Sequence, residues 1–137
     1  MQDIQKISDR ITTLMEREVE LTKAADLLNE RFAEVEATLQ AVTTSASVPL
    51  QNVDPETEPC VRFAFRRHQR KRQLVIVSSI GPDCDDEVKH ITSAPLRHRV
   101  EAAELLPKLI DRLVAQAEKI AQSARDAADT LNNMMND

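Results

Sequence analysis

The chain has 137 residues and a formal net charge of −5, with a single glycine, three phenylalanines and no tryptophan or tyrosine. This length favours one folding unit. The composition is typical of an elongated helical protein and argues against a compact enzyme, which needs glycine for tight turns and aromatic residues for a thick core. No apolar run approaches the roughly 18 residues of a membrane span, and the charged N-terminal segment does not resemble a signal peptide. We therefore expect a cytoplasmic protein with no membrane partner.

Residues 1–43 carry a heptad pattern that predicts a coiled-coil helix. The flanking positions are mostly polar, so the apolar stripe is narrow and requires a partner helix. Glu18 is the one polar residue in the stripe; it is either tolerated near the surface of a thin bundle or sets the register and the choice of partner. The a and d positions are Ile4, Ile7, Ile11, Leu14, Glu18, Leu21, Ala25, Leu28, Phe32, Val35, Leu39 and Val42.

The middle of the chain predicts a linker followed by a small sheet. Residues 44–59 combine β-branched residues and serines with three prolines and three acids, which cannot continue a helix. Residues 60–94 contain alternating and β-branched segments that predict a three-stranded antiparallel β-meander. The predicted strands cover residues 60–66, 73–80 and 87–94.

Residues 95–135 return to the heptad pattern and predict an alanine-rich helix. Pro107 lies inside this pattern and predicts a bend near 107 or a division of the helix. The stripe is wider than a two-stranded seam needs, so this helix should contact more than one neighbour. Its a positions are Ala103, Ile110, Ala117, Ala124 and Leu131, its d positions are Leu106, Leu113, Ile120, Ala127 and Met134, and its apolar e positions are Val114, Ala121 and Ala128.

Together these segments predict one elongated α+β domain over residues 1–137. The two helices should fold back on each other as a long antiparallel helical hairpin, a coiled coil, with the small β-meander between them at one end. A second copy would bury the remaining apolar row and complete a helical bundle, giving a homodimer or a higher homo-oligomer. The alternative is that the extra alanines are simply good helix formers that face water.

The order of helix, β-meander and helix is similar to the layout of prefoldin subunits, in which long coiled-coil arms grow from a β-platform. The resemblance extends over the chain and rests on the order of the elements. It implies a holdase chaperone whose helix ends expose apolar residues, here Met134 and Met135.

Residues 62–72 contain six cations and no acid, in a chain that is otherwise acidic. If the first two strands pair, residues 67–72 connect them at the tip of a hairpin. Such a tip could bind the phosphates of a nucleic acid, with a steep dependence on salt, or an acidic surface of an unidentified protein partner. The alternative is a solvated hairpin end, because no aromatic residue stands among the cations and no glycine lets backbone amides surround a phosphate. The candidate binding residues are Arg62, Arg66, Arg67, Arg70, Lys71 and Arg72.

The sequence offers little for chemistry. The three histidines and two cysteines lack the spacing of a zinc site, so we expect no metal. No phosphate loop, nucleophile elbow or inward-facing carboxylate pair is evident, so we expect no catalytic residue, no cofactor and no small-molecule substrate. The sequence thus predicts a non-enzymatic coiled-coil scaffold or adaptor for protein–protein interaction and self-assembly. The alternatives are nucleic-acid binding through residues 62–72 and a prefoldin-like holdase.

Overall fold

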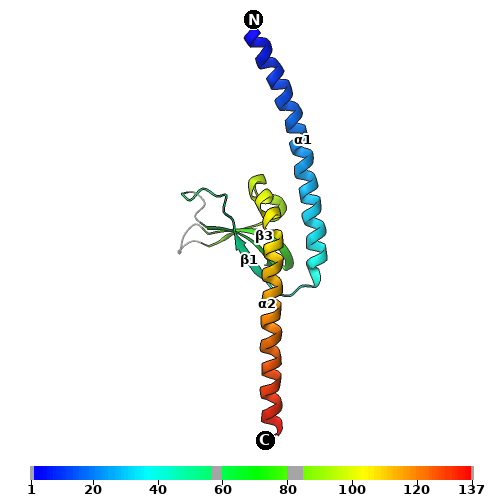
Figure 1. The fold of residues 1–137 in the computed structure, drawn as a ribbon, viewed down its shortest axis with the longest axis vertical. Coiled ribbons are helices and arrows are strands. Elements are labelled where there is room, and N and C mark those ends of the chain that lie inside the picture. Colours follow the sequence, from blue (N-terminus) through cyan, green and yellow to red (C-terminus); the bar gives the residue numbers. More distant parts are fainter. Residues whose placement is uncertain (1, 57–59, 80–84, 137) are drawn as a thin grey trace.

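The computed structural model describes residues 2–56, 60–79 and 85–136. It is an α+β fold in which the four strands of an antiparallel sheet come between two long helices along the chain (Figure 1). Helix α1 (Gln2–Thr38) runs into a short 3-10 helix (Leu39–Ala41), and a second 3-10 helix (Ile91–Ser93) precedes helix α2 (Leu96–Asn136). The strands are β1 (Ala46–Pro49), β2 (Cys60–His68), β3 (Lys71–Ser79) and β4 (Glu87–His90).

The two helices do not form the antiparallel hairpin that the sequence predicts. The N-terminus and the C-terminus lie at opposite ends of the molecule, and both helices run in the same direction along its long axis (Figure 1). They overlap only beside the sheet, where the last turns of α1 and the first half of α2 pack on the strands. The apolar residues of β2 and β3 therefore bury the parts of the two stripes nearest the sheet, and over the described residues α1 and α2 do not pair as a coiled coil.

The sheet has four strands where the sequence predicts three, because the predicted linker over residues 44–59 contains β1. This strand pairs antiparallel with β2, with Ala46 opposite Phe65 and Pro49 opposite Arg62. The strand order is β1-β2-β3-β4, so β1 lies at an edge of the sheet. Proline cannot donate a backbone hydrogen bond, and an edge strand is where a sheet tolerates it. The proline that argued against a strand is thus part of one.

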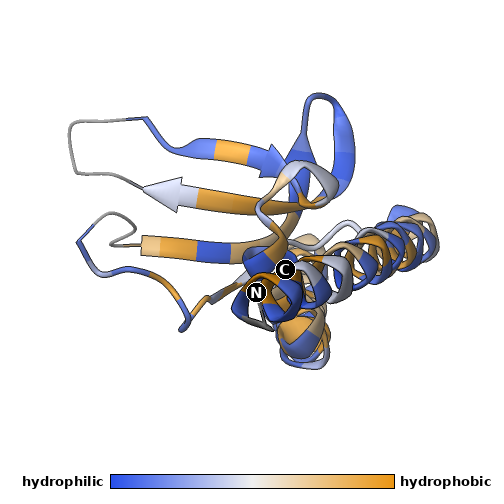
Figure 2. Cartoon of the chain, turned by 90° about the horizontal axis from the view of Figure 1, so that it is seen from above, coloured by the Kyte–Doolittle hydropathy of each residue, from blue (hydrophilic) through white to orange (hydrophobic). Residues whose placement is uncertain are grey.

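The core lies between the inner face of the sheet and the two helices. Successive side chains of a strand point to opposite faces, and the inner face of β2 carries Val61, Phe63 and Phe65, which are all buried. Phe63 packs edge-on against Phe32 of α1, with ring centroids 6.2 Å apart and an interplanar angle of 68°. Helix α2 adds Ala102, Leu109 and Leu113. Viewed along the long axis, the sheet extends to one side of the helices (Figure 2).

Glu36 fastens α1 to the sheet beyond the end of β4. One of its carboxylate oxygens accepts a hydrogen bond from the backbone N–H of Leu74 at 2.9 Å and lies 2.8 Å from Nε2 of His90. The other ring nitrogen of His90, Nδ1, accepts from the backbone N–H of Thr92 at 3.4 Å. Nδ1 also lies 2.7 Å from the hydroxyl of Thr92. Because a carboxylate can only accept, Nε2 is the donor in the contact with Glu36. The carboxylate of Glu36 therefore accepts hydrogen bonds from donors on both β3 and β4.

Two side chains of α2 fasten that helix to β1 and to the residues after it. The buried carboxylate of Glu101 accepts from the backbone N–H of Gln51 at 2.6 Å and of Asn52 at 3.0 Å. Arg112 donates from Nη1 to the carbonyl of Ser47 at 2.6 Å, on the edge strand. Backbone groups at the end and edge of a sheet lack strand partners, and these contacts satisfy them.

Helix α2 continues through Pro107 without division. Proline has no N–H to donate to the carbonyl four residues earlier, here that of Ala103. Pro107 itself faces solvent, and the helix continues past it although this hydrogen bond cannot form. The alternative of a division into a short and a long helix is therefore wrong, and the bend near 107 stays a prediction.

Candidate functional site

The six predicted binding residues lie on the hairpin of β2 and β3. These strands pair over their full length, from Cys60 opposite Ser79 to His68 opposite Lys71. Strand β1 accompanies β2 only over residues 62–65, and β4 accompanies β3 only over residues 75–78. Residues 66–73 thus form a two-stranded ribbon that extends past both neighbours, which we call the basic ribbon. The predicted connection over residues 67–72 is wrong, because only two residues separate the strands.

The two-residue turn of the basic ribbon holds non-glycine residues in left-handed backbone conformations. Gln69 has φ of 51° and Arg70 has φ of 68°. Two-residue hairpin loops favour asparagine and glycine at such positions, since other residues are sterically disfavoured there. Strained positions of this kind concentrate at functional sites. Here a long cation occupies the position that suits glycine best.

Four cations of the basic ribbon are exposed: Arg66, Arg67, Arg70 and Lys71. Within the described part of the chain, no carboxylate forms an ion pair with any of them. Residues 60–79 contain no acid. The positive charge of the ribbon is therefore not neutralised locally, and a partner with negative charge would find it accessible.

Arg72, by contrast, has a structural role. Its guanidinium carbon lies 4.8 Å above the centroid of the Phe65 ring, and its Nη2 donates to the carbonyl of Thr44. Its own carbonyl accepts from Nε2 of Gln40 at 2.9 Å. These contacts attach the base of the basic ribbon to the chain after α1. Arg72 is therefore a poor candidate for partner binding, although the sequence grouped it with the others.

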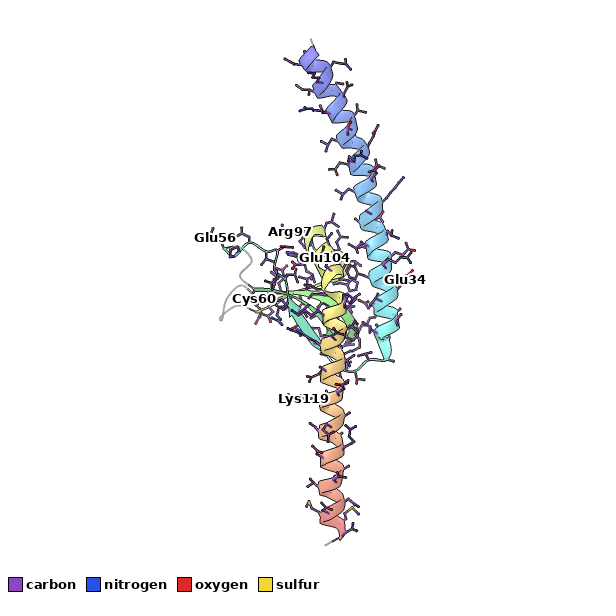
Figure 3. The ribbon with its side chains drawn as sticks, in the orientation of Figure 1. Glu34, Glu56, Cys60, Arg97, Glu104 and Lys119 are labelled. Carbon is purple, nitrogen blue, oxygen red and sulfur yellow. The ribbon has the colours of Figure 1, made fainter. Side chains whose placement is uncertain are left out.

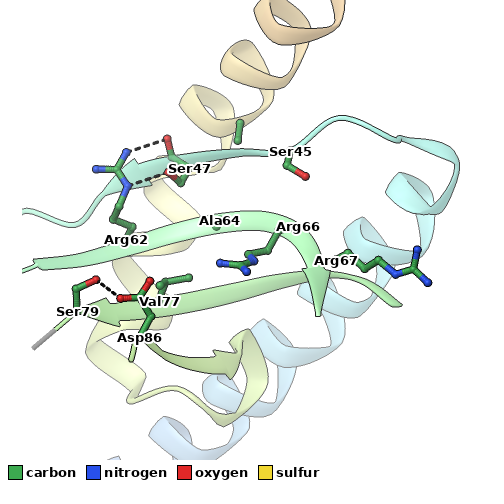
Figure 4. A pocket seen from close by; sticks show the side chains of 10 residues that line it. Ser45, Ser47, Arg62, Ala64, Arg66, Arg67, Val77, Ser79 and Asp86 are labelled. Atoms are coloured by element: carbon green, nitrogen blue, oxygen red, sulfur yellow. Dashed lines mark hydrogen bonds between the residues drawn. The ribbon is translucent and has the colours of Figure 1, made fainter. Parts of the chain in front are cut away.

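A groove of about 600 Å³ opens on the outer face of the sheet, away from the helices (Figure 4). Arg62 and Arg66 border it, and Ala64 and Val77 form its floor, as the alternation of β2 predicts for the face opposite the phenylalanines. Arg62 donates from Nε to the hydroxyl of Ser47 at 2.8 Å, which fixes its guanidinium at β1. The polar groove residues that the sequence did not predict are Ser45, Ser47, Ser79 and Asp86.

The charges along the groove are unequal. Asp86 lies at one end and accepts a hydrogen bond from the hydroxyl of Ser79 at 2.7 Å. Arg66 and Arg67, which belong to the basic ribbon, lie at the other end (Figure 4). Guanidinium groups bind carboxylates and phosphates well, so an anionic group fits beside Arg66 and is disfavoured beside Asp86. Among the described residues, no group of three or more His, Cys, Asp or Glu side chains could hold a metal ion.

Two helical segments form a second candidate surface. Residues 3–24 of α1 and residues 114–136 of α2 are exposed at every position, and their side chains extend into solvent around each helix (Figure 3). We call them the α1 arm and the α2 arm. Each is about 34 Å long at 1.5 Å per residue. No described helix is long and apolar enough to cross a membrane. The large apolar residues exposed on the arms are Ile4, Ile7, Ile11, Leu14, Met15, Val19, Leu21, Val114, Ile120, Leu131, Met134 and Met135.

The fold and these surfaces define an α+β protein with a basic β-ribbon and two exposed amphipathic helical arms. Comparison with known proteins adds no family to this description: no family model matches the chain, no curated protein matches its sequence, and no solved structure matches its fold.

Proposed function

We propose that the protein is a non-enzymatic scaffold that assembles with further copies of itself through its two arms. The observation that carries the proposal is the exposure of the heptad stripes. Ile7 and Leu14 of the α1 arm are both 58% exposed, and Leu131 of the α2 arm is 60% exposed. Isolated exposed apolar residues are common, but regular stripes along two arms indicate surfaces that other helices cover.

Helix stability supports the same proposal. An isolated helix of about 20 residues is marginally stable in water, because most of the stability of a protein helix comes from packing its apolar face. Neither arm packs its stripe within the chain. Covering a stripe removes apolar area from water at about 25 cal/mol per Å² and stabilises the helix at the same time. Assembly and helix formation in the arms should therefore be coupled.

Replacement of a stripe leucine of the α1 arm by an acid should strongly weaken this assembly. We expect the unchanged protein to sediment at a multiple of its 15.4 kDa mass. Leu14→Asp should weaken association by roughly a thousandfold, because each buried leucine contributes about 2 kcal/mol, two copies are affected, and 1.4 kcal/mol is tenfold. Analytical ultracentrifugation over a dilution series measures the change, and circular dichroism should show helicity falling on dilution.

The matched control is Thr13→Asp, which adds the same charge one residue away, at a position outside the stripe. This variant should associate like the unchanged protein. The proposal fails if the unchanged protein is monomeric at all accessible concentrations, or if both substitutions have equal effects on association.

A second candidate function is nucleic-acid binding through the basic ribbon. The observation that favours it is the projection of residues 66–73 past both neighbouring strands, with four exposed cations that no described carboxylate pairs. A two-stranded β-ribbon also fits the width of the major groove of DNA. An assembled scaffold would present several ribbons together, which would raise the overall affinity by avidity.

Reversal of the four exposed charges tests this second function. We expect a fluorescent duplex of mixed sequence to bind at low salt, with a slope of log affinity against log salt of about −3 to −4 for four phosphate contacts. The combined variant Arg66→Glu, Arg67→Glu, Arg70→Glu and Lys71→Glu should lose this binding. Fluorescence anisotropy at low salt and at about 0.15 M salt provides the measurement.

The control changes four exposed lysines to glutamate. They lie outside the basic ribbon and outside the heptad stripes, so the net charge changes by the same amount as in the ribbon variant. Its members are Lys6, Lys23, Lys108 and Lys119. If this control loses as much affinity as the ribbon variant, binding depends on net charge and the basic ribbon is not the site.

A further inference from the structure

We propose that two copies of the chain exchange their arms reciprocally, so that the α1 arm of each copy pairs antiparallel with the α2 arm of the other. This inference rests on the self-association proposed above and specifies its partner and geometry. The sequence predicts an antiparallel pairing of the two helices within one chain, and the proposal places that pairing between two chains.

The positions of the arms make this exchange possible. In one chain the arms point to opposite ends of the long axis, and the sheet lies between them (Figure 1). A second copy, rotated by 180° about an axis through the sheet and perpendicular to the long axis, places its α2 arm at the end where the first copy has its α1 arm. The rotation also reverses the chain direction, so the two arms are antiparallel. Both ends are paired at once, and the assembly closes as a symmetric dimer.

Burial sets the register of this pairing. The α1 stripe first becomes partly buried at Ala25, and the last buried residue of α2 is Leu113. Aligning these two positions places every a residue of the α1 arm opposite a d residue of the α2 arm, and every d opposite an a. The resulting layers are Ile4 with Met134, Ile7 with Leu131, Ile11 with Ala127, Leu14 with Ala124, Glu18 with Ile120 and Leu21 with Ala117.

The side-chain sizes in this register are complementary. Three layers place a leucine or isoleucine opposite an alanine, and facing positions that alternate large and small side chains interdigitate without voids. The two arms are also nearly equal in length, at 22 and 23 residues. Neither arm would leave a long part of its stripe uncovered.

Charge disfavours the pairing of two α1 arms. A parallel pair would place Glu18 opposite the Glu18 of the second copy in the seam. An antiparallel pair aligned at the same a and d positions would bring the flanking Arg10 of one arm near Arg17 of the other. The corresponding flank of the α2 arm is uncharged, with Gln116, Ser123 and Thr130. Exchange between α1 and α2 avoids both repulsions.

An apolar cleft marks the place where the partner arm would begin. It has a volume of about 180 Å³ and lies at the base of the α2 arm. In the proposed register, the partner's Leu21 faces this cleft and can place its side chain there. The lining combines residues of α2 with the last residues of the α1 stripe and one threonine beyond it: Leu39, Val42, Thr44, Ile110, Leu113, Val114 and Ala117.

Engineered cysteines at the tips of the arms test the exchange. In a background with Cys60→Ser and Cys84→Ser, the pair Ile7→Cys and Leu131→Cys should form disulfides between two chains under mild oxidation, because facing seam positions lie within disulfide range. We expect most of the protein to run as a single covalent dimer on a non-reducing gel. The pair Ile7→Cys and Ile120→Cys, two d positions that would face each other in a parallel head-to-tail chain, should run largely as uncrosslinked single chains on the same gel.

The controls separate this inference from the proposed function. Sedimentation of the uncrosslinked cysteine background reports association alone, and a monomer there overturns both proposals. A dimer that crosslinks through Ile7→Cys alone pairs its α1 arms, and a ladder of oligomers from the Ile7→Cys and Ile120→Cys pair indicates a filament. Either result overturns the exchange and leaves self-association standing. Association that appears only with a different protein overturns both.

Discussion

Replacement of Phe63 by alanine should lower the free energy of unfolding by about 3–5 kcal/mol, the usual cost of removing a buried aromatic side chain. Phe63 has no exposed surface and lies at the centre of the core between β2 and α1. Its edge contact with Phe32 would be lost as well. The polar contacts of Glu36 and Glu101 hold both helices to the sheet, so the cavity can collapse only in part. Denaturant unfolding followed by circular dichroism measures the loss.

The measurement requires one fixed protein concentration, since self-association would contribute to the apparent stability. Phe63→Leu is the matched control, and its cost should stay below about 1.5 kcal/mol because leucine fills most of the same volume. A loss below about 1 kcal/mol for Phe63→Ala would mean that the core is not packed around this ring.

Replacement of Glu101 by alanine should lower the free energy of unfolding by about 2–4 kcal/mol. The side chain is 5% exposed, and its two oxygens accept from the backbone N–H groups of Gln51 and Asn52. Hydrogen bonds to a charged acceptor each contribute about 1.5–3 kcal/mol, and the two partly buried amides would be left without an acceptor. Denaturant unfolding again provides the measurement.

Two variants define the cause of this loss. Glu104→Ala removes an exposed carboxylate on the next turn of α2 (Figure 3) and should change the free energy of unfolding by less than about 0.5 kcal/mol. Glu101→Gln keeps one acceptor but turns an NH₂ group towards the other amide, so its effect should be intermediate. Equal losses for Glu101→Ala and Glu104→Ala would show that the effect comes from the helix and not from the two amides.

The elements with strong periodicity were predictable. The heptads predicted both long helices to within a few residues, and the alternation around Phe63 and Phe65 predicted β2. These features depend on neighbouring residues along the chain, which the sequence displays directly.

The features that the sequence did not predict depend on contacts between residues that are far apart in the chain. β1 has only four residues and includes Pro49, and it exists because residues 62–65 of β2 offer it a partner. An apolar helix stripe indicates that another element packs on it, but it does not indicate which element. Here the sheet, and not the second helix, packs on part of both stripes. The separate role of Arg72 depends on the carbonyl of Thr44, which no local pattern reveals. No local sequence pattern indicates that Ser45, Ser47 and Ser79 line a common groove.

The opposite positions of the two termini determine how the molecule would carry mechanical load (Figure 1). Tension between the ends would run along α1, cross the sheet and continue along α2, because the helices contact the strands more than each other. At the crossing, the load would shear each helix against the sheet. Resistance would then come from the core around Phe63 and from the contacts of Glu36, Glu101 and Arg112 with backbone groups. The small sheet would therefore transmit the force from α1 to α2.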